Sequence, residues 1–267
     1  MIQLQSYRGV TALIRATWLS YLQERGFFFL LAFGWMMRPL VFLFVWATVA
    51  GTGRVGGLSR DEFIVYYLVF VVVNQFTYPV SNWTVGDQIR EGTMSVLLLR
   101  PLAPFYDALA NDLAGKGVFL LFVIPITGIL AIFLRPAVEI TLVNLLVFFP
   151  ALVFAWLLRF LWSYWLALLA FWATRADALL DMQNALIFLL AGHVAPIALL
   201  PGLLQKAAII LPFRYMIGFP VEVLTNQLTT GELLLGFIVQ ALWLLLAAGL
   251  SVVLWRTGLR RYHAIGG

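Results

Sequence analysis

Cysteine is absent from all 267 residues of the sequence. Its absence excludes disulfides, thiolate metal sites and cysteine nucleophiles, although it leaves the redox compartment open. The two histidines, His193 and His263, stand alone, and a metal site needs several ligands at suitable spacing. Serine, aspartate and histidine residues form no recognisable nucleophilic triad. We therefore expect neither a metal site nor an enzyme's catalytic centre.

Charged residues are scarce. They make up only 11% of the chain, whereas hydrophobic residues make up 63%; an ordinary soluble domain has about 25% charged and about 45–50% apolar residues. Residues 182–205 and 233–255 contain no Asp, Glu, Lys or Arg. A helix that crosses a bilayer needs about 20 mainly apolar residues. The composition therefore predicts an integral membrane protein.

Basic residues outnumber acidic ones, and the formal net charge is +5. No dense basic block with interleaved aromatic residues accompanies them, so nucleic acid is not an expected partner. Basic residues that flank membrane spans explain the charge more simply. The Gly115-Lys116-Gly117 triplet lacks the G-x-x-x-x-G-K-[ST] phosphate loop, so we expect no ATP site in this chain.

The apolar runs predict an all-α membrane protein with six transmembrane helices. The expected spans are residues 27–50, 63–85, 106–134, 140–173, 178–200 and 233–255. Six spans put both termini on one side, and that side holds more Lys and Arg outside the spans, which predicts cytoplasmic termini. Splitting the fourth span at Arg159 would separate the termini, but no Gly or Pro marks a turn there.

A single membrane domain with three parts is expected. Residues 27–256 form the six-span bundle and residues 257–267 a cytoplasmic tail. Residues 1–26 are expected to form an amphipathic helix along the cytoplasmic interface, which serves either as a membrane anchor or as a partner contact. Its apolar side would carry Leu4, Tyr7, Val10, Ile14, Trp18, Tyr21 and Leu22. Prolines within residues 201–231 predict a broken apolar hairpin before the last span.

The polar connection between the second and third spans is the segment most suggestive of a partner protein. Its charged residues are Asp87, Arg90, Glu91 and Arg100. Between them we expect a short helix with Thr93 as N-cap, ended by Arg100 and Pro101, whose shared apolar face consists of Met94, Leu97 and Leu98. Such a helix can seat its apolar face in a groove on another protein, while the charges orient it. The alternative is an ordinary solvated loop.

The run Ile89-Arg90-Glu91-Gly92-Thr93, followed by Leu98-Leu99-Arg100-Pro101-Leu102, resembles the cytoplasmic loop of type-2 ABC exporter (ABC-2) permeases, in the form of a poorly characterised bacterial branch. The layout of the whole chain is similar to that family as well. The resemblance implies that residues 86–101, which we call the coupling segment, include the coupling helix. The implied coupling residues are Asp87, Arg90, Glu91, Gly92, Thr93, Met94, Leu97, Leu98, Arg100 and Pro101.

The resemblance also implies a function. The chain would be the transmembrane permease subunit of an ATP-driven exporter in the bacterial inner membrane. Its partners would be separate ABC ATPase subunits, which bind ATP and Mg, a second permease protomer, identical or related, and membrane lipid. This chain itself would bind no cofactor.

Ionisable residues at membrane depth need an explanation because they are costly in hydrocarbon. The candidates are Arg38, Asp112, Lys116 and Arg159. Asp112 and Lys116 are four residues apart, share a helix face and can neutralise each other. For all four residues, structural pairing or snorkelling competes with a role in substrate contact.

Uncharged polar residues cluster in the second and fifth spans, which lie near the dimer axis in the resembled family. Those that could line a translocation path are Asn74, Gln75, Thr77, Tyr78, Gln183 and Asn184. The alternative is hydrogen bonding between helices, which is common for such residues in membrane bundles.

Two other functions are compatible with a polytopic membrane protein. A secondary transporter would normally show discontinuous helices in two related halves and membrane-embedded coupling carboxylates. A membrane-embedded lipid-modifying enzyme would show a His, Asp or Glu constellation at the interface. Neither signature is evident in the sequence.

Overall fold

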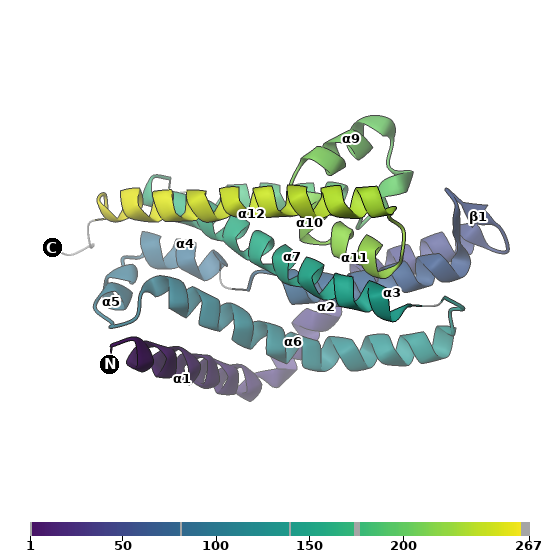
Figure 1. Ribbon diagram of the computed structural model, residues 1–267. Helices are drawn as coiled ribbons and strands as arrows, with labels where there is room; N and C mark the ends of the chain where they lie inside the picture. The colour runs from purple at the N-terminus through teal and green to yellow at the C-terminus, as the bar shows by residue number, and fades with distance from the viewer. Residues whose placement is uncertain (1, 81, 139, 174–176, 263–267) are drawn as a thin grey trace.

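The computed structural model describes residues 2–80, 82–138, 140–173 and 177–262, with backbone alone for residues 2–8, 82, 83 and 177. His263 and the rest of the expected tail from residue 263 onward lie outside the described residues. The helices in chain order (Figure 1) are α1 (Ile2–Gln23), α2 (Arg25–Ala50), α3 (Arg60–Thr77), α4 (Asn82–Arg90), α5 (Met94–Leu98), α6 (Pro104–Leu134), α7 (Leu142–Leu168), α8 (Asp177–Leu190), α9 (Gly202–Ile210), α10 (Phe213–Met216), α11 (Gly218–Leu224) and α12 (Thr230–Leu259). Strands β1 (Arg54–Val55) and β2 (Leu58–Ser59) form an antiparallel hairpin.

Within the described residues, four helices are long and apolar enough to cross a membrane: α2, α6, α12 and α7 with the 3-10 turn that follows it. They contain 26 to 31 residues, which at 1.5 Å per residue exceeds the hydrocarbon thickness of about 30 Å. The prediction of an all-α membrane protein is confirmed at this level. Helix α7 continues through Arg159 without a break, as the sequence predicts.

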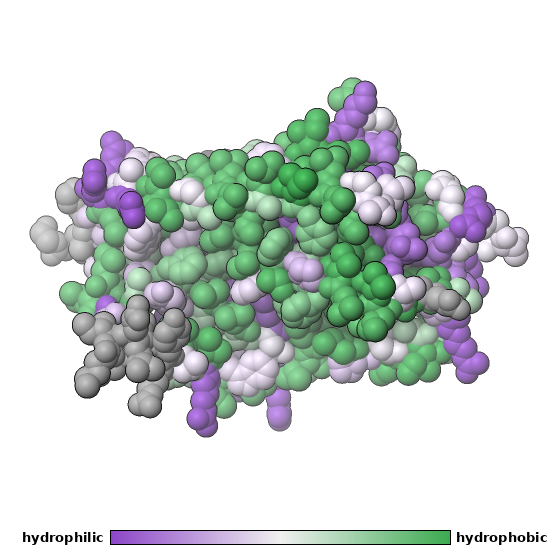
Figure 2. Space-filling model, viewed as in Figure 1, coloured by the Kyte–Doolittle hydropathy of each residue, from purple (hydrophilic) through white to green (hydrophobic). Residues whose placement is uncertain are grey.

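The long helices run between two ends of the molecule (Figure 1). Helix α1 begins and α12 ends at one end, beside α4 and α5, whereas the β hairpin and α9 lie at the other. On the face shown in Figure 2, hydrophobic side chains cover most of the middle, and hydrophilic ones gather toward both ends. A broad apolar surface of this kind is expected where lipid replaces water as the solvent.

Local sequence explains where two of these helices begin. Ser59 accepts a hydrogen bond from the Glu62 backbone N–H at 3.3 Å, and Glu62 in turn accepts one from the Ser59 N–H at 2.6 Å. Thr229 and Glu232 form the same reciprocal pair at the start of α12. Such capping boxes satisfy donors that the first helical turn leaves unpaired.

The predicted N-terminal helix is present as α1, and it packs along α6. The Trp18 ring lies so close to Gly117 that an added Cβ would be 1.8 Å from Cζ3. The Tyr21 hydroxyl donates to Asn111 Oδ1 at 3.4 Å. Trp18, Tyr21 and Leu22, from the predicted apolar side, pack against the buried core. The position of α1 at the membrane interface stays a prediction.

Two predicted spans are too long. The second was expected to reach residue 85, but α3 ends at Thr77 because Tyr78 is extended before Pro79, which disfavours a helical residue before it. The fifth was expected to reach residue 200, but α8 ends at Leu190, and Gly192 follows with φ +89°. Conversely, α12 continues to Leu259, so the expected tail begins as helix.

The predicted broken hairpin before the last span is present. It consists of α9, α10 and α11, which are only nine, four and seven residues long. Pro212 separates α9 from α10, and Ile217 separates α10 from α11. Pro212 cannot donate a helical hydrogen bond, and the backbone at Ile217 leaves the helical region with φ −144° and ψ −56°, so these short helices do not merge.

Candidate functional site

The coupling segment folds as the end of α4, a turn at Gly92 and the short helix α5. Gly92 has φ +78°, a conformation that suits glycine. Met94 and Leu97 are buried in a cluster that includes Tyr164 of α7. Leu98, expected on the same face, is instead 39% exposed. Helix α5 has less than two turns, so it offers few side chains to the neighbouring helices. Of its apolar residues, only Met94 and Leu97 are buried against them.

Thr93 occupies the predicted N-cap position of α5, but it does not cap the helix with its side chain. Thr93 already has helical backbone angles, and its side chain makes no capping hydrogen bond. The Thr93 hydroxyl donates to the Gln88 carbonyl at 3.4 Å, and the Ser95 hydroxyl donates to the Gly92 carbonyl at 2.6 Å. The turn before α5 is thus held by side chains that bond backward to carbonyls.

Tyr262, which follows α12, also holds this turn. Its hydroxyl donates to the Gly92 carbonyl at 2.7 Å and accepts from the Ser95 backbone N–H at 3.1 Å. Sequence reasoning missed this residue, because a tyrosine so far along the chain carries no local signal of a contact with the coupling segment. The end of α12 is therefore joined directly to the candidate coupling helix.

Charged and apolar groups share the outer surface of the coupling segment. Arg90 pairs with Asp87, and Arg100 lies 3.4 Å from Asp107. Leu99 is 88% exposed. The residues that lie exposed on this surface are Asp87, Glu91, Thr93, Val96, Leu98, Leu99, Arg100 and Pro101. An apolar patch with charges around it is the chemistry of a protein-binding surface.

Asp112 and Lys116 of α6 form the ion pair that their spacing predicts, with Lys116 Nζ 2.5 Å from Asp112 Oδ2. Both side chains are buried. Asp112 also accepts from the Trp156 indole N–H at 2.8 Å and from the Val80 backbone N–H at 3.0 Å. Lys116 donates to the Tyr78 carbonyl at 2.8 Å. The pair thus ties α6 to α7 and to the break after α3.

Arg159 of α7 is buried against α3. Its Nη1 donates to Asn74 Oδ1 at 3.0 Å and to the Thr77 hydroxyl at 2.9 Å. Its guanidinium carbon lies 5.3 Å from the centre of the Tyr78 ring. Three of the candidate path residues, Asn74, Thr77 and Tyr78, therefore contact a buried cation within this chain.

The other candidate path residues differ in exposure. Gln183 of α8 is buried, and its amide nitrogen donates to the Ser163 hydroxyl at 2.7 Å. Gln75 is buried, and its Nε2 has no hydrogen-bond partner among the described residues. Asn184 is half-buried. Of the charged candidates, Arg38 is exposed.

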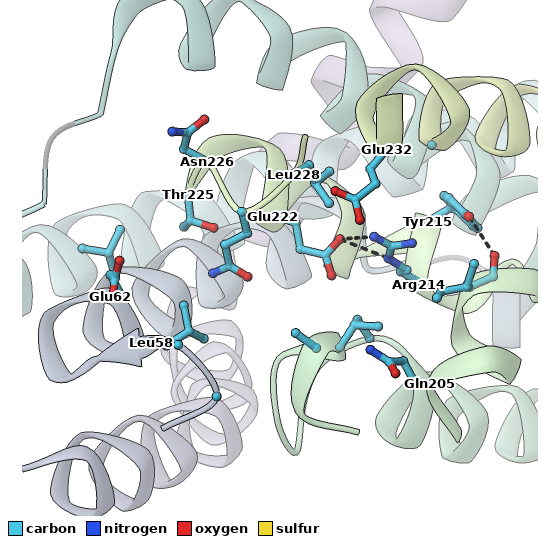
Figure 3. A pocket seen from close by; sticks show the side chains of 18 of the residues that line it. Leu58, Glu62, Gln205, Arg214, Tyr215, Glu222, Thr225, Asn226, Leu228 and Glu232 are labelled. Carbon is cyan, nitrogen blue, oxygen red and sulfur yellow. Dashed lines mark hydrogen bonds and ion pairs between the residues drawn. The ribbon is translucent and has the colours of Figure 1, made fainter. Parts of the chain in front are cut away.

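A cavity of about 530 Å³ lies at the end opposite α1 and α5, next to the broken hairpin. Figure 3 shows Arg214 and Glu222 pointing toward one another at its wall, with Glu232 beside them and Gln205 across from them. Arg214 Nη2 lies 2.7 Å from Glu222 Oε2; the Glu222 side chain is buried and that of Arg214 is half-buried. Burial raises the pKa of Glu222, which Arg214 offsets in part.

Glu62 reaches the same cavity from the first turn of α3. Burial is the largest single influence and raises its pKa, but the hydrogen bonds from Ser59 and the charge and hydrogen bond of Arg54 together outweigh it, so the pKa of Glu62 lies below its ordinary value. No group of three or more His, Asp or Glu in the described part of the chain is arranged to hold a metal ion.

Comparison with known proteins adds one finding. A family model described as "ABC-2 family transporter protein" matches residues 33–266. No curated protein and no solved structure matches the chain. The matched residues include the coupling segment, the buried charges of α6 and α7, and the broken hairpin.

Proposed function

This chain belongs to the ABC-2 family of transporter proteins, and we propose that it is the permease subunit of an ATP-driven exporter powered by separate ATPase subunits. Family membership makes it a membrane component of an ABC transporter, as its loop predicts, and such a component is not itself catalytic. The export direction, the ATPase partner, which would carry ATP and Mg, and the pairing with a second permease are our proposals.

The observation that carries the proposal is the surface of the coupling segment. Leu98 and Leu99 are exposed beside Glu91 and Arg100, at the end where α1 begins and α12 ends. Below them Met94 and Leu97 are anchored in the core. A partner that binds the exposed groups would push on α4 and α6 through buried contacts, which is what a coupling element requires.

This placement supports the membrane topology that we propose. With α3 and α8 added to the four long apolar helices, the single membrane domain has six spans. The end that carries the coupling segment faces the cytoplasm of a bacterium, together with both termini, and the broken hairpin faces outward. Helix α3 has 18 residues and α8 has 14, so each is short for a span and continues into irregular backbone that is covered by the rest of the bundle.

A second protomer, identical or related, would pack against this one around the translocation route. The polar residues of α3 and α8, with Arg38 of α2, are our candidates for its lining. Buried groups such as Arg159 and Lys116 would instead hold the helices together, because they already have partners within the chain.

Purification of the tagged chain from its native membrane tests the proposal. We expect a stoichiometric ABC ATPase to be recovered with it, and the double variant Arg90→Glu/Glu91→Arg to lose that ATPase while remaining folded. Arg60→Glu, at the opposite end, is the control and should retain it. An ATPase-free chain that catalyses ion-driven uptake would overturn the proposal in favour of a secondary transporter, and one that modifies lipid would favour an enzyme.

A further inference from the structure

Arg38 lies at the middle of α2, about 12 residues from either end. At 1.5 Å per residue this is about 18 Å, and half the hydrocarbon thickness is about 15 Å. The Arg38 side chain is exposed and has no hydrogen-bond or ion-pair partner among the described residues. Arg159 and Lys116, by contrast, are buried and paired.

Facing lipid at this depth is costly for a bare guanidinium. Hydrocarbon offers it no partner, and the distance to either headgroup layer is too long for the side chain to bridge. Cations in such positions face protein or a water-filled cavity. We therefore expect the face of α2 that carries Arg38 to be turned toward a route or a partner instead of toward the bilayer.

A shallow apolar groove surrounds Arg38. It has a volume of about 470 Å³ and is lined by Met37, Arg38, Val41 and Phe42 of α2 and by Phe188 of α8. The centres of the Phe42 and Phe188 rings, which both line the groove, are 6.2 Å apart, so α2 and α8 meet there. The groove thus presents one fixed positive charge among apolar side chains and no carboxylate.

We propose that this groove binds the anionic group of an amphiphilic substrate. Arg38 would receive a phosphate or another oxyanion through its planar fork of donors, which suits such groups. Met37, Val41 and the two phenylalanines would contact the apolar part. This inference rests on the proposed function, because the groove can bind a transported substrate only if the chain is a permease and the groove lies on its translocation route.

Binding measurements on the whole chain in nanodiscs of zwitterionic lipid test this directly. The probe is radiolabelled dodecyl phosphate, and dodecyltrimethylammonium is the cationic counterpart of equal chain length. We expect the chain to bind the phosphate more tightly than the ammonium. Arg38→Gln should weaken phosphate binding by about tenfold or more, as expected for loss of a charge-assisted contact.

Two further variants separate charge from folding. Arg38→Lys should keep most of the preference for phosphate, because it keeps the charge. Arg25→Gln, at the exposed start of the same helix, should change nothing. Retained ammonium binding by Arg38→Gln would show that this variant is folded. Equal binding of phosphate by Arg38→Gln and the unaltered chain would overturn the inference.

The competing explanation is a contact between two copies of the chain. Asp181 lies exposed on α8, seven residues before Phe188, and could pair with Arg38 of a second copy. If Arg38→Asp disrupted a dimer and Arg38→Asp/Asp181→Arg restored it, Arg38 would be an interface residue and the substrate site would be wrong. Added phosphatidylglycerol identifies the source of the anion: displacement of the probe indicates a bilayer lipid, and no displacement indicates another amphiphile.

The outcomes separate this inference from the proposed function. A chain that co-purifies with an ATPase but shows no phosphate preference would refute only the substrate class. A chain that binds the phosphate through Arg38 but never associates with an ATPase would refute only the exporter.

Discussion

Asp112 and Lys116 show how single residues stabilise this membrane protein. Each carries a charge that would be costly alone in the interior, and each has further hydrogen bonds to neighbouring elements. Because removing one partner leaves the other charge unpaired, Lys116→Met should lower the free energy of unfolding by about 3–5 kcal/mol. Thermal unfolding in detergent, followed by circular dichroism, measures this loss.

The double variant Asp112→Asn/Lys116→Met is the matched control for that measurement. It carries no charge at this position, and the Asn oxygen can still accept from the Val80 N–H. It should therefore recover much of the lost stability. A Lys116→Met protein as stable as the unaltered chain would show that Asp112 is protonated or hydrated instead of paired.

At the scale of elements, the bend after α8 is the feature that most depends on one residue. Gly192 has φ +89°, and an added Cβ would lie 2.2 Å from the Tyr66 hydroxyl oxygen. Tyr66 donates to the Gly192 carbonyl at 3.2 Å, and Trp46 donates to the Val194 carbonyl at 2.7 Å. Side chains of α2 and α3 thus fix where α8 stops.

Gly192→Ala should therefore destabilise the protein by at least about 1–2 kcal/mol, from backbone strain and the collision with Tyr66. Gly128→Ala is the control, since nothing lies within 4 Å of its added Cβ inside α6, and it should be neutral or slightly stabilising. The same unfolding assay compares them. Equal stability of the two variants would mean that the bend after α8 requires neither the positive φ of Gly192 nor its close contact with Tyr66.

The contact between α12 and the coupling segment gives a second prediction at this scale. Tyr262→Phe removes the hydroxyl that bonds Gly92 and Ser95, so the turn before α5 should open more often. Hydrogen exchange of the amides from residues 92 to 98 should become faster, while exchange in α9 stays unchanged. Unchanged exchange around Ser95 would show that α5 is held by Met94 and Leu97 alone.

These elements also show what the sequence could and could not predict. Long apolar runs with few charges predicted α2, α6, α7 and α12, because burial in lipid depends mainly on composition. Pro79 marks the end of α3 in the sequence. The prediction missed it because the span was assigned from hydropathy over a longer run of residues. The end of α8 depends on a positive φ at Gly192, which composition does not encode.

The candidate site was predictable to a similar extent. Spacing along one helix predicted the Asp112–Lys116 pair, because both residues lie in α6. The partners of Arg159 and the role of Tyr262 come from helices distant in sequence. Leu98 is exposed because the neighbouring helices cover only Met94 and Leu97 of α5. That limited coverage is visible only in the packed structure.

At the scale of the whole molecule, the absence of cysteine makes the topology easy to test. Single cysteines can be introduced at Ser95, within the coupling segment, and at Gly57, in the β hairpin, without first removing any native thiol. A membrane-impermeant maleimide should label position 57 from outside intact cells and position 95 only after the membrane is opened. Labelling of both positions from outside would contradict the six-span arrangement.

The central claim is that an ATPase binds the coupling segment, and cross-linking from single positions tests it most directly. Leu99 and Leu203 are 88% and 86% exposed and lie at opposite ends of the molecule, so they form a matched pair. A photoreactive amino acid at position 99 should capture an ABC ATPase in native membranes, and one at position 203 should not. Failure to capture an ATPase at position 99, or its capture at position 203, would contradict the account.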